Sequence, residues 1–264
     1  MSFTLSNVMG NAFSSVRKGF MPLLIVTSLL YLLPTLLITA GLRFGLGVTL
    51  GTASSFQGDM LAVSSAAFLV LYFMTFMHIS AASEVCILTI AGRPVKLAEV
   101  FAHGLRNAVP IFLIYLLCAV GWLTGIVLLL VPGFIFGTFY SLVVPAYVTE
   151  KPGIFGAFSR SQALTKGHRW GIFGLWLLIV ILFYLAITAV EVPLLMPMIQ
   201  GSLKAAQSGQ QFVPPVPSFG ITAALSVAAS IIFVVMLAIN ASVYSCLRAE
   251  KDKLSGAGLD KVFE

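Results

Sequence analysis

The chain has 264 residues, of which 59% are hydrophobic and only 9% are charged. Soluble domains carry about 25% charged residues, so this composition excludes a water-soluble globular protein and indicates a polytopic membrane protein. The formal net charge of +6 does not point to a nucleic-acid partner, because in a membrane protein the placement of positive residues matters more than their sum. The apolar runs are continuous rather than alternating, which predicts an all-α fold and not a transmembrane β-barrel.

The chain opens with a predicted amphipathic helix over residues 3–18. Its apolar residues recur at helical spacing from Leu5 to Val16, and Arg17 and Lys18 follow them. This pattern is typical of a helix that lies in the headgroup layer of a membrane. The next apolar run, over 20–42, predicts the first membrane helix. We expect that helix to act as the insertion signal, because the preceding residues lack a signal-peptide pattern.

The second apolar run, over 62–90, contains the ionisable residues His78 and Glu84. Such residues are costly inside a bilayer and are often functional, so these two and Asn240 of the last run form the candidate intramembrane polar site. The run is longer than one span. Glu84 therefore has two interpretations: an embedded functional carboxylate, or an interfacial carboxylate paired with a basic residue or with Asn240. His78 and Glu84 lie about 120° apart around a helix and do not share one face.

The middle of the chain predicts a membrane hairpin. Residues 97–105 repeat the amphipathic pattern ahead of Arg106, and apolar runs follow over 108–131 and 133–149. One helix over both runs would be roughly 60 Å long, about twice the hydrocarbon thickness. The VPG sequence at 131–133 breaks the helix, so we predict two membrane helices that reverse direction at this point.

A third amphipathic helix is predicted over 154–166, and Gly167 is a good residue to end it. Apolar runs over 170–193 and 219–246 predict the last two membrane helices, and residues 247–264 predict a cytoplasmic tail. The order of a surface helix followed by a membrane hairpin thus occurs three times. It represents either a true internal repeat or the same physical requirement met at each point where the chain enters the membrane.

The distribution of positive charge supports six membrane helices. With six, thirteen of the fifteen Lys and Arg residues lie on one side, and only Arg43 and Lys204 lie on the other. Cytoplasmic loops carry the excess of Lys and Arg. We therefore predict a multi-pass protein of the bacterial inner membrane, with both termini and all three amphipathic helices on the cytoplasmic face.

Six basic residues of that face are candidate contacts for lipid headgroups or phosphate, although topology alone would also explain them. A basic residue near anionic lipid contributes about 1 kcal/mol. No nucleotide-binding, hydrolase or metal-ligand motif is recognisable, and the three cysteines match no metal spacing. We therefore predict no catalytic residue, cofactor or metal. The candidate headgroup contacts are Arg93, Lys96, Arg106, Arg160, Lys166 and Arg169.

Residues 131–175 read VPGFIFGTFYSLVVPAYVTEKPGIFGAFSRSQALTKGHRWGIFGL. This stretch resembles the membrane-domain family named after bacterial glycerophosphoryl diester phosphodiesterases, in which the domain precedes a catalytic barrel in some members. The similarity includes the VPG break, Glu150, the pair Arg160-Ser161 and the pair Arg169-Trp170, and it extends to 92–110 and to 2–20. The chain ends at Glu264 without room for a catalytic barrel of about 250 residues, so the resemblance implies a membrane domain without phosphodiesterase activity.

These observations predict a non-enzymatic integral membrane protein of the cell envelope. It would act as a scaffold, or as a module that binds membrane lipids, including anionic ones, or an envelope protein partner. The alternative is a transporter of small molecules or lipids, with Glu84 and Asn240 lining its path. A water-filled cavity that reaches Glu84 would favour the transporter.

Overall fold

The computed structural model describes residues 3–41, 57–128, 136–208 and 219–260. These residues form helices joined by short turns, with no strand among them, which confirms the all-α fold class. Within the described ranges, five helices are long and apolar enough to cross a membrane, as expected for a multi-pass membrane protein. They cover Phe20–Ala40, Ser65–Ile90, Leu97–Gly125, Arg169–Ala186 and Phe219–Asp252.

The first two predicted elements form as separate helices. Helix α1 (Leu5–Lys18) begins after Thr4, whose hydroxyl accepts a hydrogen bond from the Asn7 amide at 3.3 Å, and ends at Gly19. The first membrane segment follows directly as α2 (Phe20–Thr27), the π-helical turn η1 (Ser28–Leu32) and α3 (Leu33–Ala40). Gly19 permits this sharp junction, because a Cβ there would lie 2.8 Å from the Ser15 carbonyl oxygen.

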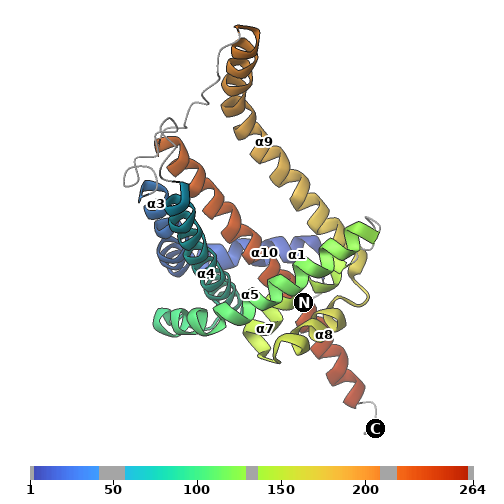
Figure 1. Ribbon diagram of the computed structural model, residues 1–264. Coiled ribbons are helices and arrows are strands. Elements are labelled where there is room, and N and C mark those ends of the chain that lie inside the picture. The colour runs from blue at the N-terminus through green and yellow to red at the C-terminus, as the bar shows by residue number, and fades with distance from the viewer. Residues whose placement is uncertain (1–2, 42–56, 129–135, 209–218, 261–264) are drawn as a thin grey trace.

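Helices α4 (Gln57–Ile90) and α5 (Leu97–Leu128) pack closely against each other. At their contact, a Cβ on Gly104 would lie 3.2 Å from the Met77 carbonyl oxygen, so a larger residue would push the two backbones apart by a few tenths of an ångström. Helix α5 is continuous through Pro110. The predicted surface helix at 97–105 and the predicted membrane helix from 108 are therefore one helix, which runs across the lower part of Figure 1.

The fourth predicted span, over 133–149, is not confirmed. Residues 136–140 are helical, a turn follows at 141–142, and α7 (Val143–Glu150) starts in a new direction. An eight-residue helix is about 12 Å long and cannot cross about 30 Å of hydrocarbon by itself. The predicted VPG reversal at 131–133 lies outside the described residues.

The last two helices extend beyond their predicted ends, whereas the helix before them does not. Helix α8 (Ile154–Thr165) closely matches the prediction, and Gly167, with φ of 96°, separates it from α9 (Arg169–Ser208). Helix α9 passes through Pro193 and Pro197 without ending. Helix α10 (Phe219–Asp260) continues well into the predicted tail, so the tail begins as helix rather than as loop.

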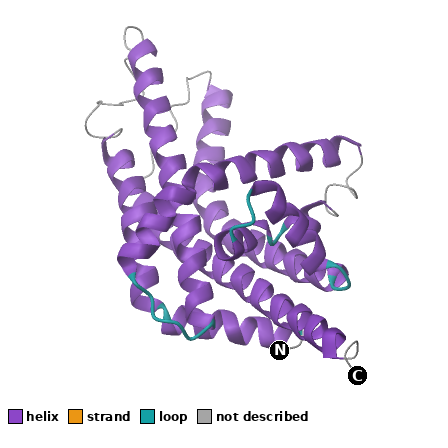
Figure 2. Cartoon of the chain, turned by 90° about the horizontal axis from the view of Figure 1, so that it is seen from below, coloured by secondary structure: helices purple, strands orange, loops and turns teal. Residues whose placement is uncertain are grey.

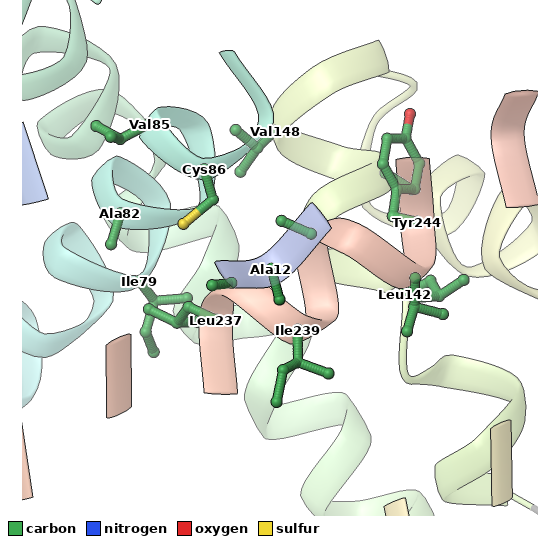
Figure 3. Packing of buried hydrophobic residues seen from close by; sticks show 14 of the residues in the cluster. Ala12, Ile79, Ala82, Val85, Cys86, Leu142, Val148, Leu237, Ile239 and Tyr244 are labelled. Atoms are coloured by element: carbon green, nitrogen blue, oxygen red, sulfur yellow. The ribbon is translucent and has the colours of Figure 1, made fainter. Parts of the chain in front are cut away.

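The main core lies where α1, α4, α7 and α10 meet (Figure 3). Small side chains such as Ala12, Ala82 and Cys86 are at most 5% exposed there and allow the helices to approach closely. Van der Waals packing of small residues is the usual basis of helix association in membranes. The buried Leu237 and Tyr244 contribute from α10. All three cysteines are free, and Cys86 and Cys246 are buried.

The points where helices begin and end gather at two opposite sides of the molecule. In Figure 1, α3 ends and α4 begins at the upper end, as α9 ends and α10 begins, whereas α7, α8 and the end of α10 lie at the lower end. The first described residue lies close to the end of α10, since the Phe3 amide donates to Glu250 Oε2 at 3.1 Å. Figure 2 shows the helices from below, on the side of this lower end. We call this lower part of the molecule the basic end, because Arg93, Lys151 and Arg248 line one cavity there.

Candidate functional site

The basic end contains a network of charged side chains centred on Glu150, at the end of α7. Arg160 of α8 donates from Nε to both carboxylate oxygens of Glu150, at 2.8 and 3.1 Å. The Tyr244 hydroxyl of α10 donates to Glu150 Oε1 at 2.7 Å. Arg248 lies one turn further along α10, and its Nε is 3.7 Å from Glu150 and 3.5 Å from Asp252. One carboxylate thus holds α7, α8 and α10 together.

The pKa shifts of Glu150 and Arg160 favour an ion pair in which both side chains are charged. Desolvation raises the pKa of Glu150, but the hydrogen bonds from Arg160 and Tyr244 and the charges of Arg160 and Arg248 outweigh it, so the pKa is lowered from 4.5. Desolvation lowers the pKa of Arg160, but the bond to Glu150 more than compensates and the pKa is raised. Both side chains therefore stay ionised at neutral pH and bind each other rather than a ligand.

Ser161, next to Arg160, stabilises the turn that interrupts the fourth apolar run. Its hydroxyl donates to the Phe139 carbonyl at 2.7 Å and accepts from the Leu142 amide at 3.2 Å, and the residue is fully buried. These backbone groups lie where helix 136–140 ends and α7 begins, so they lack the partners that a continuous helix would provide. The Arg160-Ser161 pair thus fastens α8 to both parts of the broken run.

The continuation of α10 also binds the N-terminus and the junction between α8 and α9. Glu250 accepts from the Phe3 amide, and its other oxygen lies 2.8 Å from His168 Nε2. Lys251 donates to the Lys166 carbonyl at 3.1 Å. The part of α10 that the sequence assigned to a free tail is therefore a docking point for three segments that are distant in sequence.

The six predicted headgroup contacts fall into two groups. Arg160 is bound to Glu150, Lys96 pairs with Glu99 at 2.9 Å, and the Arg169 guanidinium lies 3.9 Å from the centre of the Phe139 ring. These three have protein partners. Within the described part of the chain, the other three form no ion pair with a carboxylate, and all are exposed. They are Arg93, Arg106 and Lys166.

A cavity of about 350 Å³ opens at the basic end between α4, α7 and α10. Arg93, Lys151 and Arg248 contribute three positive charges to its wall, and Glu84 contributes one carboxylate. Neither Arg93 nor Lys151 forms an ion pair with another described residue. Lys151 takes its place through a left-handed backbone conformation, with φ of 51°, that ends α7. The cavity has the charge and the size to receive an anionic group.

The three predicted intramembrane polar residues do not come together. His78 is buried, and its Nε2 lies 3.1 Å from the Thr27 hydroxyl. The Glu84 Oε1 atom lies 2.8 Å from His103 Nδ1 at the contact between α4 and α5. Asn240 lies on α10 in the wall of a different cavity. Glu84 thus has a basic partner near the end of α4, as the second interpretation of this residue requires, and that partner is His103.

A second, larger cavity of about 410 Å³ lies between α5, residues 136–144, α9 and α10. Its wall is mainly apolar and aromatic, with Trp122, Phe136, Phe173 and Trp176 among its residues. Two polar atoms of wall residues, Trp176 Nε1 and Asn240 Oδ1, are buried and have no hydrogen-bond partner among the described residues. We call this cavity the apolar pocket.

Sequence reasoning missed Glu150, Tyr244 and Arg248 as a connected group, because it used Arg160 and Arg169 only as positive charges. The sequence did contain one indication of this group. Glu150, Arg160 and Ser161 all lie in residues 131–175, the stretch quoted above for its resemblance to a known family. The hydrogen bonds that these three residues make explain why they occur together in one stretch. Comparisons with protein-family models, with curated proteins and with solved structures find no match to this chain.

Proposed function

We propose that this chain is a non-enzymatic integral protein of the bacterial inner membrane that binds anionic lipid headgroups at its basic end and serves there as an envelope scaffold. The observation that carries the proposal is the 350 Å³ cavity, in which Arg93 and Lys151 form no ion pair with any described carboxylate, whereas Arg248 lies beside Glu150. An unpaired basic cluster at a membrane surface attracts anionic lipid.

The exposed apolar residues at the basic end support a position in the headgroup layer. Helix α1 turns Val8 and Ala12 into the core and leaves Phe13 72% exposed. Phe155 of α8 and Trp170 at the start of α9 are 80% and 85% exposed. Aromatic side chains beside basic residues are typical of the membrane–water interface. We therefore place α1, the start of α5 and α8 on the cytoplasmic surface as the three amphipathic helices.

The orientation follows from an even number of crossings. If 108–131 and 133–149 form a complete hairpin, the chain crosses six times. If they enter the membrane and return on the same side, it crosses four times. Both arrangements put the two termini on one side, and the excess of Lys and Arg makes that side cytoplasmic. We propose the six-span arrangement and membership of the phosphodiesterase-associated membrane-domain family as working assignments.

The decisive test measures lipid binding by charge variants that leave the Glu150 network intact. The double variant Arg93→Gln, Lys151→Gln removes the two unpaired charges of the cavity. The matched control, Arg43→Gln, Lys204→Gln, removes the same charge from the side that the sequence predicts to be opposite. Native mass spectrometry of gently solubilised protein should show anionic lipid retained by the parent and the control and lost from the cavity variant. Equal retention by all three proteins would refute headgroup binding.

Transport is the second candidate, and two observations favour it: Asn240 lies in the wall of the apolar pocket, and Glu84 lines the cavity of the basic end. These two proposed path residues line different cavities, however, and Glu84 also contacts His103. Flux measured in liposomes with the parent and with Glu84→Gln separates the functions. A flux that depends on Glu84 would replace the scaffold proposal with transport.

A further inference from the structure

The apolar pocket is a different site from the cavity of the basic end. Its wall residues come from α5, α9, α10 and the broken run, and none of them lines the basic cavity. Asn240 and Arg248, which line the two cavities from α10, are eight residues apart, or about 12 Å along the helix. An inference about the apolar pocket therefore goes beyond the proposed headgroup binding and can fail independently of it.

The pocket has the dimensions and the lining of a ligand site. Its volume of about 410 Å³ falls within the range of roughly 300–1,000 Å³ for small-molecule sites, which are mostly apolar with a few polar groups that fix orientation. Trp122 and Trp176 contribute large apolar surfaces from two different helices. Val180 lines the pocket and is 56% exposed, and Leu182, two residues further along α9, is 57% exposed, so an apolar molecule in the bilayer can reach this region from the side.

The two unpartnered polar atoms define the polar part of the ligand. Trp176 Nε1 can only donate a hydrogen bond, whereas Asn240 Oδ1 can only accept one. Buried polar atoms are normally paired, and an unpaired one in a native structure needs an explanation. One ligand group satisfies both atoms if it accepts from the indole and donates to the amide oxygen. A hydroxyl group does both, whereas an ester carbonyl only accepts and a plain hydrocarbon does neither.

We propose that the apolar pocket binds a neutral amphiphile, an apolar chain that ends in a hydroxyl group. The hydroxyl accepts from Trp176 and donates to Asn240, and the chain occupies the apolar remainder of the pocket. Long-chain alcohols and acylglycerols with a free hydroxyl share this chemistry.

Glycines provide a way to block the pocket without disturbing the fold. Gly137 lines the pocket, and a Cβ at this position would meet no atom within 4 Å. The leucine side chain introduced by Gly137→Leu therefore occupies the empty volume of the pocket and does not displace other protein atoms. Gly174 of α9 is equally open but is not a lining residue, so Gly174→Leu is its matched control.

The test uses the fluorescence of Trp176 in the full chain, reconstituted in phosphatidylcholine nanodiscs. The chain has three tryptophans, and the background Trp122→Phe, Trp170→Phe leaves Trp176 as the only one. The probe is 11-bromoundecanol, whose bromine quenches tryptophan. We expect saturable quenching that unbrominated undecanol reverses, whereas 1-bromoundecane, which lacks the hydroxyl, binds about tenfold more weakly, the factor for about 1.4 kcal/mol of lost hydrogen bonding.

The variants complete the test. Asn240→Leu should weaken the probe about tenfold, Gly137→Leu should abolish saturable quenching, and Gly174→Leu should behave as the parent. The Arg93→Gln, Lys151→Gln variant should also bind the probe as the parent does, which keeps this result separate from headgroup binding. Thermal unfolding confirms that each variant is folded. Quenching that rises linearly without competition, equal binding of the two brominated probes, or an unchanged affinity in Asn240→Leu would each overturn the proposal.

Discussion

Substitution of Ser161 by Ala tests whether the break in the fourth apolar run depends on one buried hydroxyl. The change removes a 2.7 Å bond to the Phe139 carbonyl and a 3.2 Å bond from the Leu142 amide, and it adds no atom. A buried backbone group left without a partner costs about 1–3 kcal/mol. With two such groups affected, we expect the free energy of unfolding to fall by roughly 2–4 kcal/mol.

The chain contains a convenient reporter for this experiment. Cys86 and Cys246 are buried, so a dye that becomes fluorescent on reaction with thiols reports unfolding of the protein in detergent. At about 2–4 °C per kcal/mol for a chain of this size, the melting temperature should fall by about 4–16 °C. Ser159→Ala is the matched control, because Ser159 is exposed on the same helix.

Two outcomes would contradict the reasoning. If Ser161→Ala melted within a degree of the parent, the turn at 141–142 would not need the hydroxyl, and the interruption of the run would have to come from its own sequence. If Ser159→Ala were equally destabilising, the effect would come from the lower polarity of α8 rather than from the two hydrogen bonds.

Three further predictions concern the same packed end of the molecule. Tyr244→Phe removes a 2.7 Å bond to an ionised carboxylate and should lower the free energy of unfolding by about 1.5–3 kcal/mol, measured by thermal unfolding against Tyr72→Phe, whose side chain is exposed. Because the pKa of Glu150 in the folded protein is lowered from 4.5, its contribution to the free energy of unfolding should be complete above about pH 4.5 and should disappear as the pH falls below this value. Glu150→Gln should therefore flatten the dependence of stability on pH in this range. If the slope were unchanged, it would belong to other carboxylates. Gly104→Val should destabilise by about 1–3 kcal/mol through overpacking against Met77, and a melting temperature equal to that of the parent would show that α4 and α5 separate freely.

The sequence predicted helix positions well where composition alone decides them. The runs at 20–42, 62–90, 170–193 and 219–246 all lie largely in helices of the structure, because a continuous apolar segment has few alternatives in a membrane. Gly167 follows the end of α8 as predicted, and α1 ends at Lys18, the predicted last residue. The boundary between 105 and 108 failed because Pro110 lies near the start of the apolar part of α5, and the helix continues through it.

Contacts between distant segments were less predictable. The run 133–149 has the hydropathy of a span, but the turn that interrupts it is hydrogen-bonded by Ser161 of α8, a residue outside the run that hydropathy does not take into account. The sequence left Glu84 with two interpretations, and its contact with His103 could be identified only once α4 and α5 were placed against each other. Asn240 and Trp176 share one pocket through the tertiary arrangement of α9 and α10, which no local pattern encodes.

The position of Glu250 and Arg248 near the end of the chain sets an order for assembly. Ribosomes add about 5–20 residues per second, so Glu150 emerges roughly 5–20 s before Glu250, which is 100 residues later. During that interval α7 and α8 can pair with each other, but His168 and the amide of Phe3 lack the carboxylate that later binds both. The basic end is thus closed by α10, which is synthesised after the segments that it binds, and a nascent chain that stalls before residue 248 would leave this end of the molecule open.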